Sequence, residues 1–189
     1  MTIGGAQDRS AIRRVALVGA IGLITTGILY IIGRAIVRTS SYSTVGLFGQ
    51  TTYTGVVSLK SLLATIALAL AVVQVGLALW MYGKLPFGRA PRAVPTTHRV
   101  TGIVAVIVTL PVALHCAIAY GVQLSQPRVL VHSIAGCFFY GAFLAKVLLV
   151  HSKKLPGWAL PVAGGILAVL IAVLWYTSAL WYYNGFSLP

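Results

Sequence analysis

Acidic residues are almost absent from this 189-residue chain. Asp8 is the only Asp or Glu, so nothing acidic follows it. A proton relay or cation-coupled transporter built on carboxylates within the membrane therefore has no side chains to use. No glycine-rich nucleotide fingerprint follows a strand, and the two cysteines, Cys116 and Cys137, lie apart in apolar runs without CxxC spacing. These absences argue against ion transport, nucleotide binding and a structural zinc site.

Apolar residues, by contrast, dominate the chain. Hydrophobic residues make up 59% and charged residues 8% of it, and the mean hydropathy is +0.95. A helix needs about 20 apolar residues to cross a bilayer. Five runs meet that length: 15–33, 62–82, 100–122, 129–150 and 158–178. The sequence thus predicts an all-α polytopic membrane protein, a five-helix transmembrane bundle forming a single domain over residues 1–189.

The net charge of +13 would indicate nucleic acid as the partner of a soluble protein. In a membrane protein it is better explained by the excess of Lys and Arg on the cytoplasmic side. With a cytoplasmic N-terminus and an outside C-terminus, nine flanking cations lie inside and four outside: Arg9, Arg13, Arg14, Lys84, Arg89, Arg92, Arg99, Lys153 and Lys154 against Arg34, Arg38, Lys60 and Arg128. We therefore expect a multi-pass protein of the plasma membrane, whose partner is the lipid bilayer and not nucleic acid.

The four histidines, His98, His115, His132 and His151, all lie in the third and fourth predicted helices or at their edges. A short turn joins these helices, which predicts an antiparallel hairpin of neighbouring helices. In such a hairpin His115 and His132 are equally far from the turn, and so, within two residues, are His98 and His151. The sequence predicts two histidine pairs, one in the outer half of the membrane and one near its cytoplasmic surface, about 25 Å apart at 1.5 Å per residue.

The rotation around the helices supports the same pairing. His98 and His115 are 17 residues apart and His132 and His151 are 19 apart, which turns the ligand face by about 260° and about 100°. A rotation of about 260° equals about −100°, so the histidine face turns by about 100° on each helix, in opposite senses. If one pair converges on a common group, the other pair can converge too.

Two opposed imidazoles at each of two depths are what two b-type haems require, because the iron of a porphyrin leaves two axial positions open. Gly102, Gly136 and Ala119 follow their ligands by one turn and leave room for a macrocycle. The propionates are expected to pair with Arg99 and Lys153 at the inner haem and with Arg128 at the outer haem. Gln74, in the second helix, is expected to tie helices together.

On these four histidines the chain resembles the di-haem membrane cytochromes b, broadly the cytochrome b561 and ferric-reductase-like transmembrane families. The resemblance lies in pattern and covers mainly residues 98–151. It implies a membrane electron-transfer subunit that passes electrons across the bilayer between a quinone or protein partner and an acceptor. It also implies a redox partner protein or other membrane subunits. Whether the chain is itself an enzyme stays open; as part of one, it would be the membrane subunit of an oxidoreductase.

A second interpretation belongs to a different class. The histidines can serve only packing, with His98 and His151 at the membrane interface and His115 and His132 hydrogen-bonding between helices. The chain would then be a haem-free integral membrane scaffold or assembly factor. A visible spectrum of the purified protein distinguishes the two.

Overall fold

A computed structural model describes residues 3–35 and 46–188 of the chain, so Arg38 lies outside the described residues. The described residues form helices joined by short connections. In chain order they are α1 (Ile3–Ala35), α2 (Tyr53–Met81), α3 (Ala93–Ala119), α4 (Pro127–Val150), α5 (Ala159–Trp175), the π-helix η1 (Tyr176–Leu180) and α6 (Trp181–Tyr183). Among these described residues, five spans are long and apolar enough to cross a membrane, which confirms the predicted all-α, five-span fold.

The helices differ from the predicted ranges at their ends. α2 begins nine residues before the predicted 62–82, where the Thr52 hydroxyl accepts a hydrogen bond from the Gly55 N–H at 3.2 Å. α3 spans Ala93–Ala119 and not the predicted 100–122. It ends three residues early because Gly121 takes a φ of +61°. The predicted fifth helix, 158–178, leaves the α-helical form at Tyr176. Apolar runs mark the lipid-facing length, whereas caps and glycines set where each helix begins and ends.

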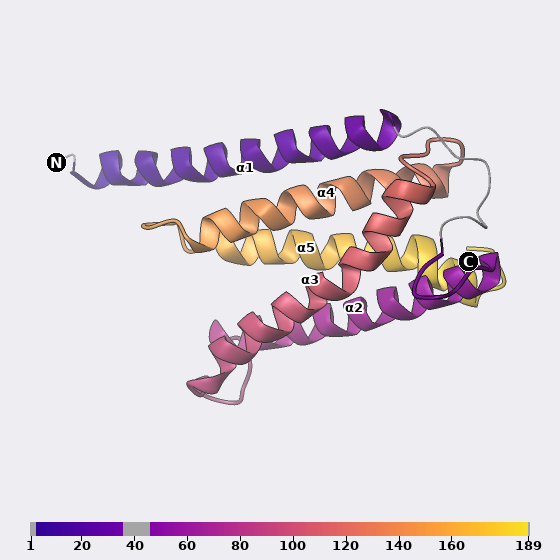
Figure 1. Cartoon of the computed structure of the whole chain (residues 1–189). Helices are drawn as coiled ribbons and strands as arrows, with labels where there is room; N and C mark the ends of the chain where they lie inside the picture. Colours follow the sequence, from indigo (N-terminus) through magenta and orange to yellow (C-terminus); the bar gives the residue numbers. More distant parts are fainter. Residues whose placement is uncertain (1–2, 36–45, 189) are drawn as a thin grey trace.

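The helices pack in the order α1, α4, α5, α2, with α3 lying along α2 (Figure 1). α3 and α4 run in opposite directions as predicted, but they are not among the described helix pairs that pack closely along their length. A hydrogen bond from Tyr140 Oη to Thr109 Oγ1, at 3.0 Å, links them near the middle. The prediction of a closely packed α3–α4 hairpin was therefore wrong, because α1 and α5 occupy the flanks of α4.

α1 packs on α4 at a crossing of small residues. A side chain at Gly22 would lie 2.9 Å from the Gly141 carbonyl oxygen and 3.0 Å from Ala145 Cβ. One at Gly141 would collide with the Thr26 hydroxyl and the Gly22 carbonyl. Such close contact supplies the van der Waals packing that holds helices together in lipid.

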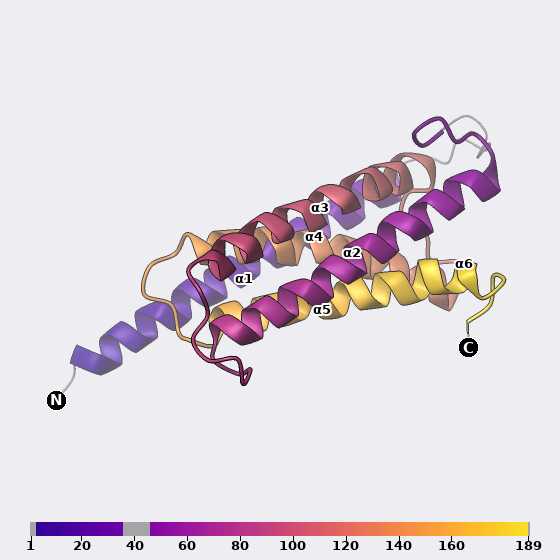
Figure 2. The same ribbon diagram turned by 90° about the horizontal axis from the view of Figure 1, so that it is seen from below.

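The buried core lies between α2, α4 and α5, where Ala71, Ala135 and Phe139 meet Leu167, Leu170 and Ile171. α1 begins and α6 ends at opposite ends of the bundle (Figure 2). We call the end where α3 begins and α4 ends the inner end, following the predicted orientation, and the opposite end the outer end. α3 adds no residue to this core cluster, so its histidines face other surroundings.

Candidate functional site

The outer end holds the most enclosed histidines. His115, on the last turns of α3, is only 5% exposed, and its ring centroid lies 5.7 Å from that of Tyr120. His132, on the second turn of α4, is half-buried. Its Nδ1 lies 2.9 Å from the Thr177 hydroxyl on η1.

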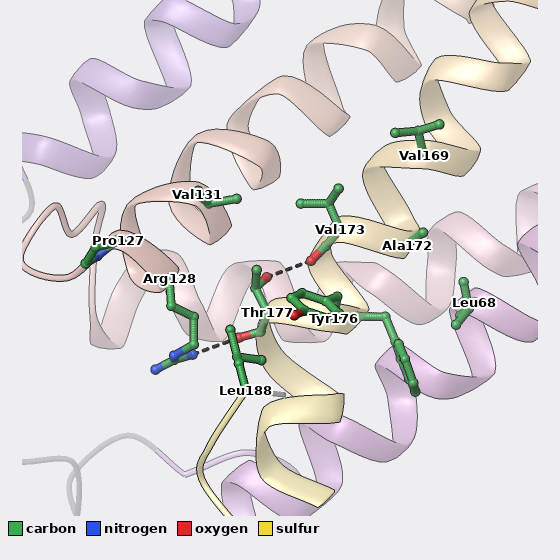
Figure 3. Close-up of a pocket in the computed structure, with 11 residues that line it drawn as sticks. Leu68, Pro127, Arg128, Val131, Val169, Ala172, Val173, Tyr176, Thr177 and Leu188 are labelled. Carbon is green, nitrogen blue, oxygen red and sulfur yellow. Dashed lines mark hydrogen bonds between the residues drawn. The ribbon is translucent and has the colours of Figure 1, made fainter. Parts of the chain in front are cut away.

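The Thr177 hydroxyl determines the role of His132 Nδ1. That hydroxyl has one proton, which it donates to the Val173 carbonyl at 2.7 Å (Figure 3). Its oxygen can therefore only accept from His132, so Nδ1 carries the imidazole proton. The other ring nitrogen, Nε2, is then the one with a free lone pair, the form in which histidine binds a metal.

His151 has the same tautomer for the same kind of reason. Its Nδ1 lies 2.8 Å from the Val147 carbonyl oxygen, and a carbonyl only accepts hydrogen bonds. Nδ1 is again the protonated nitrogen, so Nε2 is the potential ligand. Both histidines of α4 thus have the outer-sphere hydrogen bond that accompanies most metal-ligating imidazoles.

The π-helix η1 carries the support of His132. Short π-helical segments inside α-helices are rare and frequent at functional sites. Here the Thr177 carbonyl accepts a hydrogen bond from Arg128 at 2.7 Å, while the Arg128 guanidinium lies 3.8 Å above the Trp181 ring. Thr177 therefore binds two α4 side chains one turn apart, which fixes α4 against the end of α5.

A lysine approaches the outer site from α2. Lys60 Nζ donates to Cys116 Sγ at 3.4 Å and lies 4.4 Å from the centroid of the Tyr120 ring. A thiol is a weak acceptor, and an aromatic face offers only a cation–π contact. The charge of this membrane-embedded ammonium is thus only partly compensated.

His98 occupies a different setting at the inner end. Its ring is half-buried, and its Nδ1 is a buried nitrogen without a hydrogen-bond partner among the residues that the structure describes. Its carbonyl accepts from Gln74 at 2.7 Å, and the same amide donates to Thr101. Gln74 thus joins α2 to α3, as predicted. A buried polar atom without a partner carries a free-energy cost that a ligand can remove.

The expected room beside the ligands is only partly there. A side chain at Gly102 would lie 3.2 Å from the Gln74 amide oxygen, so this glycine makes room for Gln74 and not for a macrocycle. At Gly136 the nearest atom is Leu174 Cδ2 at 3.9 Å, which leaves ordinary contact space. The pattern of small residues therefore fits the outer site better than the inner one.

Each predicted histidine pair lies at one end of the bundle. His115 and His132 lie at the outer end, and His98 and His151 at the inner end, because α3 and α4 run in opposite directions. At the inner end, no hydrogen bond or ring contact among the described residues joins His98 to His151, which is exposed at the end of α4. The two histidines of each pair thus lie at the same end of the bundle, but the inner pair is not in contact.

The predicted propionate partners are only partly placed near the histidines. Arg128 lies one turn before His132, but its guanidinium contacts Thr177 and Trp181. Arg99 and Lys153 are exposed at the inner end, where the Lys153 carbonyl accepts from Arg14 at 2.7 Å. Arg128 keeps N–H groups for a further anion, whereas the two inner cations face away from the bundle.

An apolar groove lies beside the outer site, between α4 and α5 (Figure 3). It has a volume of about 790 Å³. Its surface is almost entirely apolar, and its lining residues are Leu68, Pro127, Arg128, Val131, Val169, Ala172, Val173, Trp175, Tyr176, Thr177 and Leu188. Its floor thus includes Thr177, the residue that holds His132.

The sequence did not predict the contact of Thr177 with His132 or that of Lys60 with Cys116. Thr177 lies in the outer part of the fifth span, at the depth of His132, so a polar residue there could have been recognised as a partner. Lys60 was counted only as an orientation marker, although an ionisable residue within a span is itself a sign of function. Neither contact could be derived without knowing that α5 packs on α4 and α2 on α3.

The fold and these contacts define a five-span α-helical membrane protein with histidines in its bundle. The chain belongs to the family of unknown function DUF6529, whose model matches residues 15–189. No curated protein and no solved structure matched the chain.

Proposed function

We propose that this protein is a membrane electron-transfer subunit that carries two b-type haems, with His115 and His132 as ligands of the outer haem and His98 and His151 as ligands of the inner one. The observation that carries the proposal is the hydrogen-bond partner at Nδ1 of both α4 histidines, 2.9 Å away for His132 and 2.8 Å away for His151. Thr177 and Val147 hold protons on Nδ1 of His132 and His151, and each Nε2 is left as a ligand.

The donor set suits haem better than a bare metal ion. Among the described residues no three His, Cys, Asp or Glu side chains gather into one group, whereas a haem iron takes only two axial ligands from the protein. When bound, the group would supply reversible one-electron oxidation and reduction. The chain would hold the imidazoles in position and exclude water around His115, which is almost fully buried.

The outer groove supports a quinone as one redox partner. Its almost entirely apolar lining suits the isoprenoid tail of a quinone. Thr177 lies on the wall of the groove and holds His132, so a quinone there would lie next to the outer ligand. A redox partner protein or other membrane subunits would complete the path, and the plasma membrane is the proposed location.

A reduced-minus-oxidised visible spectrum of the purified protein, with haem counted per chain, tests this function. We expect Soret and alpha bands and two haems per chain. His115→Ala and His132→Ala should each remove the same haem signal, whereas Ser178→Ala, whose hydroxyl bonds only within its own helix to the Leu174 carbonyl, should leave both. If the spectrum of haem-supplemented wild-type protein has no haem bands, the haem-free scaffold is the correct alternative.

A further inference from the structure

Two lysines inside the spans have no carboxylate to pair with. Lys60 is in the third turn of α2 and Lys146 in the last turns of α4, and the only acidic side chain of the protein is Asp8, before the first apolar run. An unpaired charge in a low-dielectric setting is strongly disfavoured. Charged residues within membrane spans therefore face a partner or a polar cavity.

Neither lysine turns away from the bundle. Lys60 Nζ contacts Cys116, the neighbour of the outer ligand His115. Lys146 Nζ lies 3.9 Å from the point where a side chain at Gly164 of α5 would begin.

The positive charge of Lys146 has still fewer compensating contacts than that of Lys60. The half-buried side chain of Lys146 makes no hydrogen bond within the part of the chain that the structure describes, and it lies on α4 five residues before His151. Each end of the bundle thus has one lysine of the spans near a proposed ligand, Lys60 at the outer end and Lys146 at the inner end.

We propose that Lys60 and Lys146 bind the propionate carboxylates of the outer and inner haem, respectively. The inference rests on the proposed haem function and replaces the exposed Arg99 and Lys153 as partners of the inner group. The chain supplies no carboxylate within its spans, whereas each haem brings two. An ammonium beside a carboxylate in a low-dielectric site forms a short charge-assisted hydrogen bond.

Site-specific redox titration tests the assignment. Lys60→Gln should lower the midpoint potential of the haem that His115→Ala removes, and Lys146→Gln that of the other haem, because losing a nearby cation disfavours the reduced iron. Lys60→Arg and Lys146→Arg should restore most of each shift. Lys84→Gln, in the exposed α2–α3 connection, is the matched control and should change neither potential.

A second measurement needs no substitution that could disturb folding. Apoprotein is reconstituted with haem or with haem dimethyl ester, whose propionates carry no charge. The ester should bind the wild type more weakly than haem does. Unchanged potentials in both Gln variants, or equal binding of ester and haem, would overturn the lysine assignment while leaving the function intact. A wild-type protein without haem bands would instead overturn both proposals.

Discussion

At the scale of single residues, the Thr177 hydroxyl is the clearest link between hydrogen bonding and chemistry. It has one proton and two acceptor positions, and its proton is directed to the Val173 carbonyl. Serine or threonine in a helix commonly bonds back to the preceding turn in this way. The result here is an acceptor aimed at His132 Nδ1, 2.9 Å away.

Replacing Thr177 by Val should therefore weaken the binding of the proposed outer haem without removing its ligands. Valine keeps the shape but cannot accept from Nδ1, so His132 loses its fixed tautomer and orientation. Loss of such a supporting partner typically weakens binding by about 10- to 100-fold. Haem retention during dilution in detergent measures it, with Thr177→Ser as the control that keeps the hydroxyl. Equal retention by the valine and serine variants would show that this hydrogen bond has no part in binding.

At the scale of helices, the apolar runs predicted which segments cross the membrane but not which helices touch. All five spans were identified from apolar runs, since only long apolar helices satisfy both lipid and backbone. The α3–α4 contact was predicted from a short connection alone. Chain proximity joins the ends of two helices, yet the flanks of α4 are taken by α1, through Gly22 and Gly141, and by α5.

The glycine crossing between α1 and α4 gives a direct test of this packing. Gly141→Leu should separate α1 from α4, because even its Cβ would collide with the Thr26 hydroxyl and the Gly22 carbonyl. Overpacking of this kind costs about 1–3 kcal/mol. We expect a lower Tm in detergent, measured by a thermal unfolding assay. Gly19→Ala, where no atom lies within 4 Å of the added Cβ, should leave the Tm unchanged; a Tm equally unchanged in Gly141→Leu would contradict the crossing.

At the scale of the whole molecule, the odd number of spans separates the beginning of α1 from the end of α6 (Figure 2). The excess of Lys and Arg around α1, the α2–α3 connection and the end of α4 predicts that this end is cytoplasmic. Histidine spacing likewise predicted which residues share a depth, because helical rise is fixed. It could not predict how far apart α3 and α4 lie, since that depends on neighbours distant in the chain.

Labelling with an impermeant thiol reagent tests the orientation. In a variant lacking Cys116 and Cys137, a cysteine at Ser187 should react in intact cells, because it lies after the fifth span. A cysteine at Ala90, in the α2–α3 connection, should react only after permeabilisation. The reverse pattern would mean that the protein is inserted with its N-terminus outside.

The crossing of α1 on α4 has a consequence for biosynthesis. The two glycines that meet there lie about 120 residues apart in the chain, so at roughly 5–20 residues per second α1 waits on the order of ten seconds for its partner. During that interval α2 and α3 can already pair through Gln74. His132 and its partner Thr177 emerge later, on α4 and η1. The outer site is therefore completed only after η1 has emerged, so the proposed outer haem is expected to bind after α1 to α4 have been made.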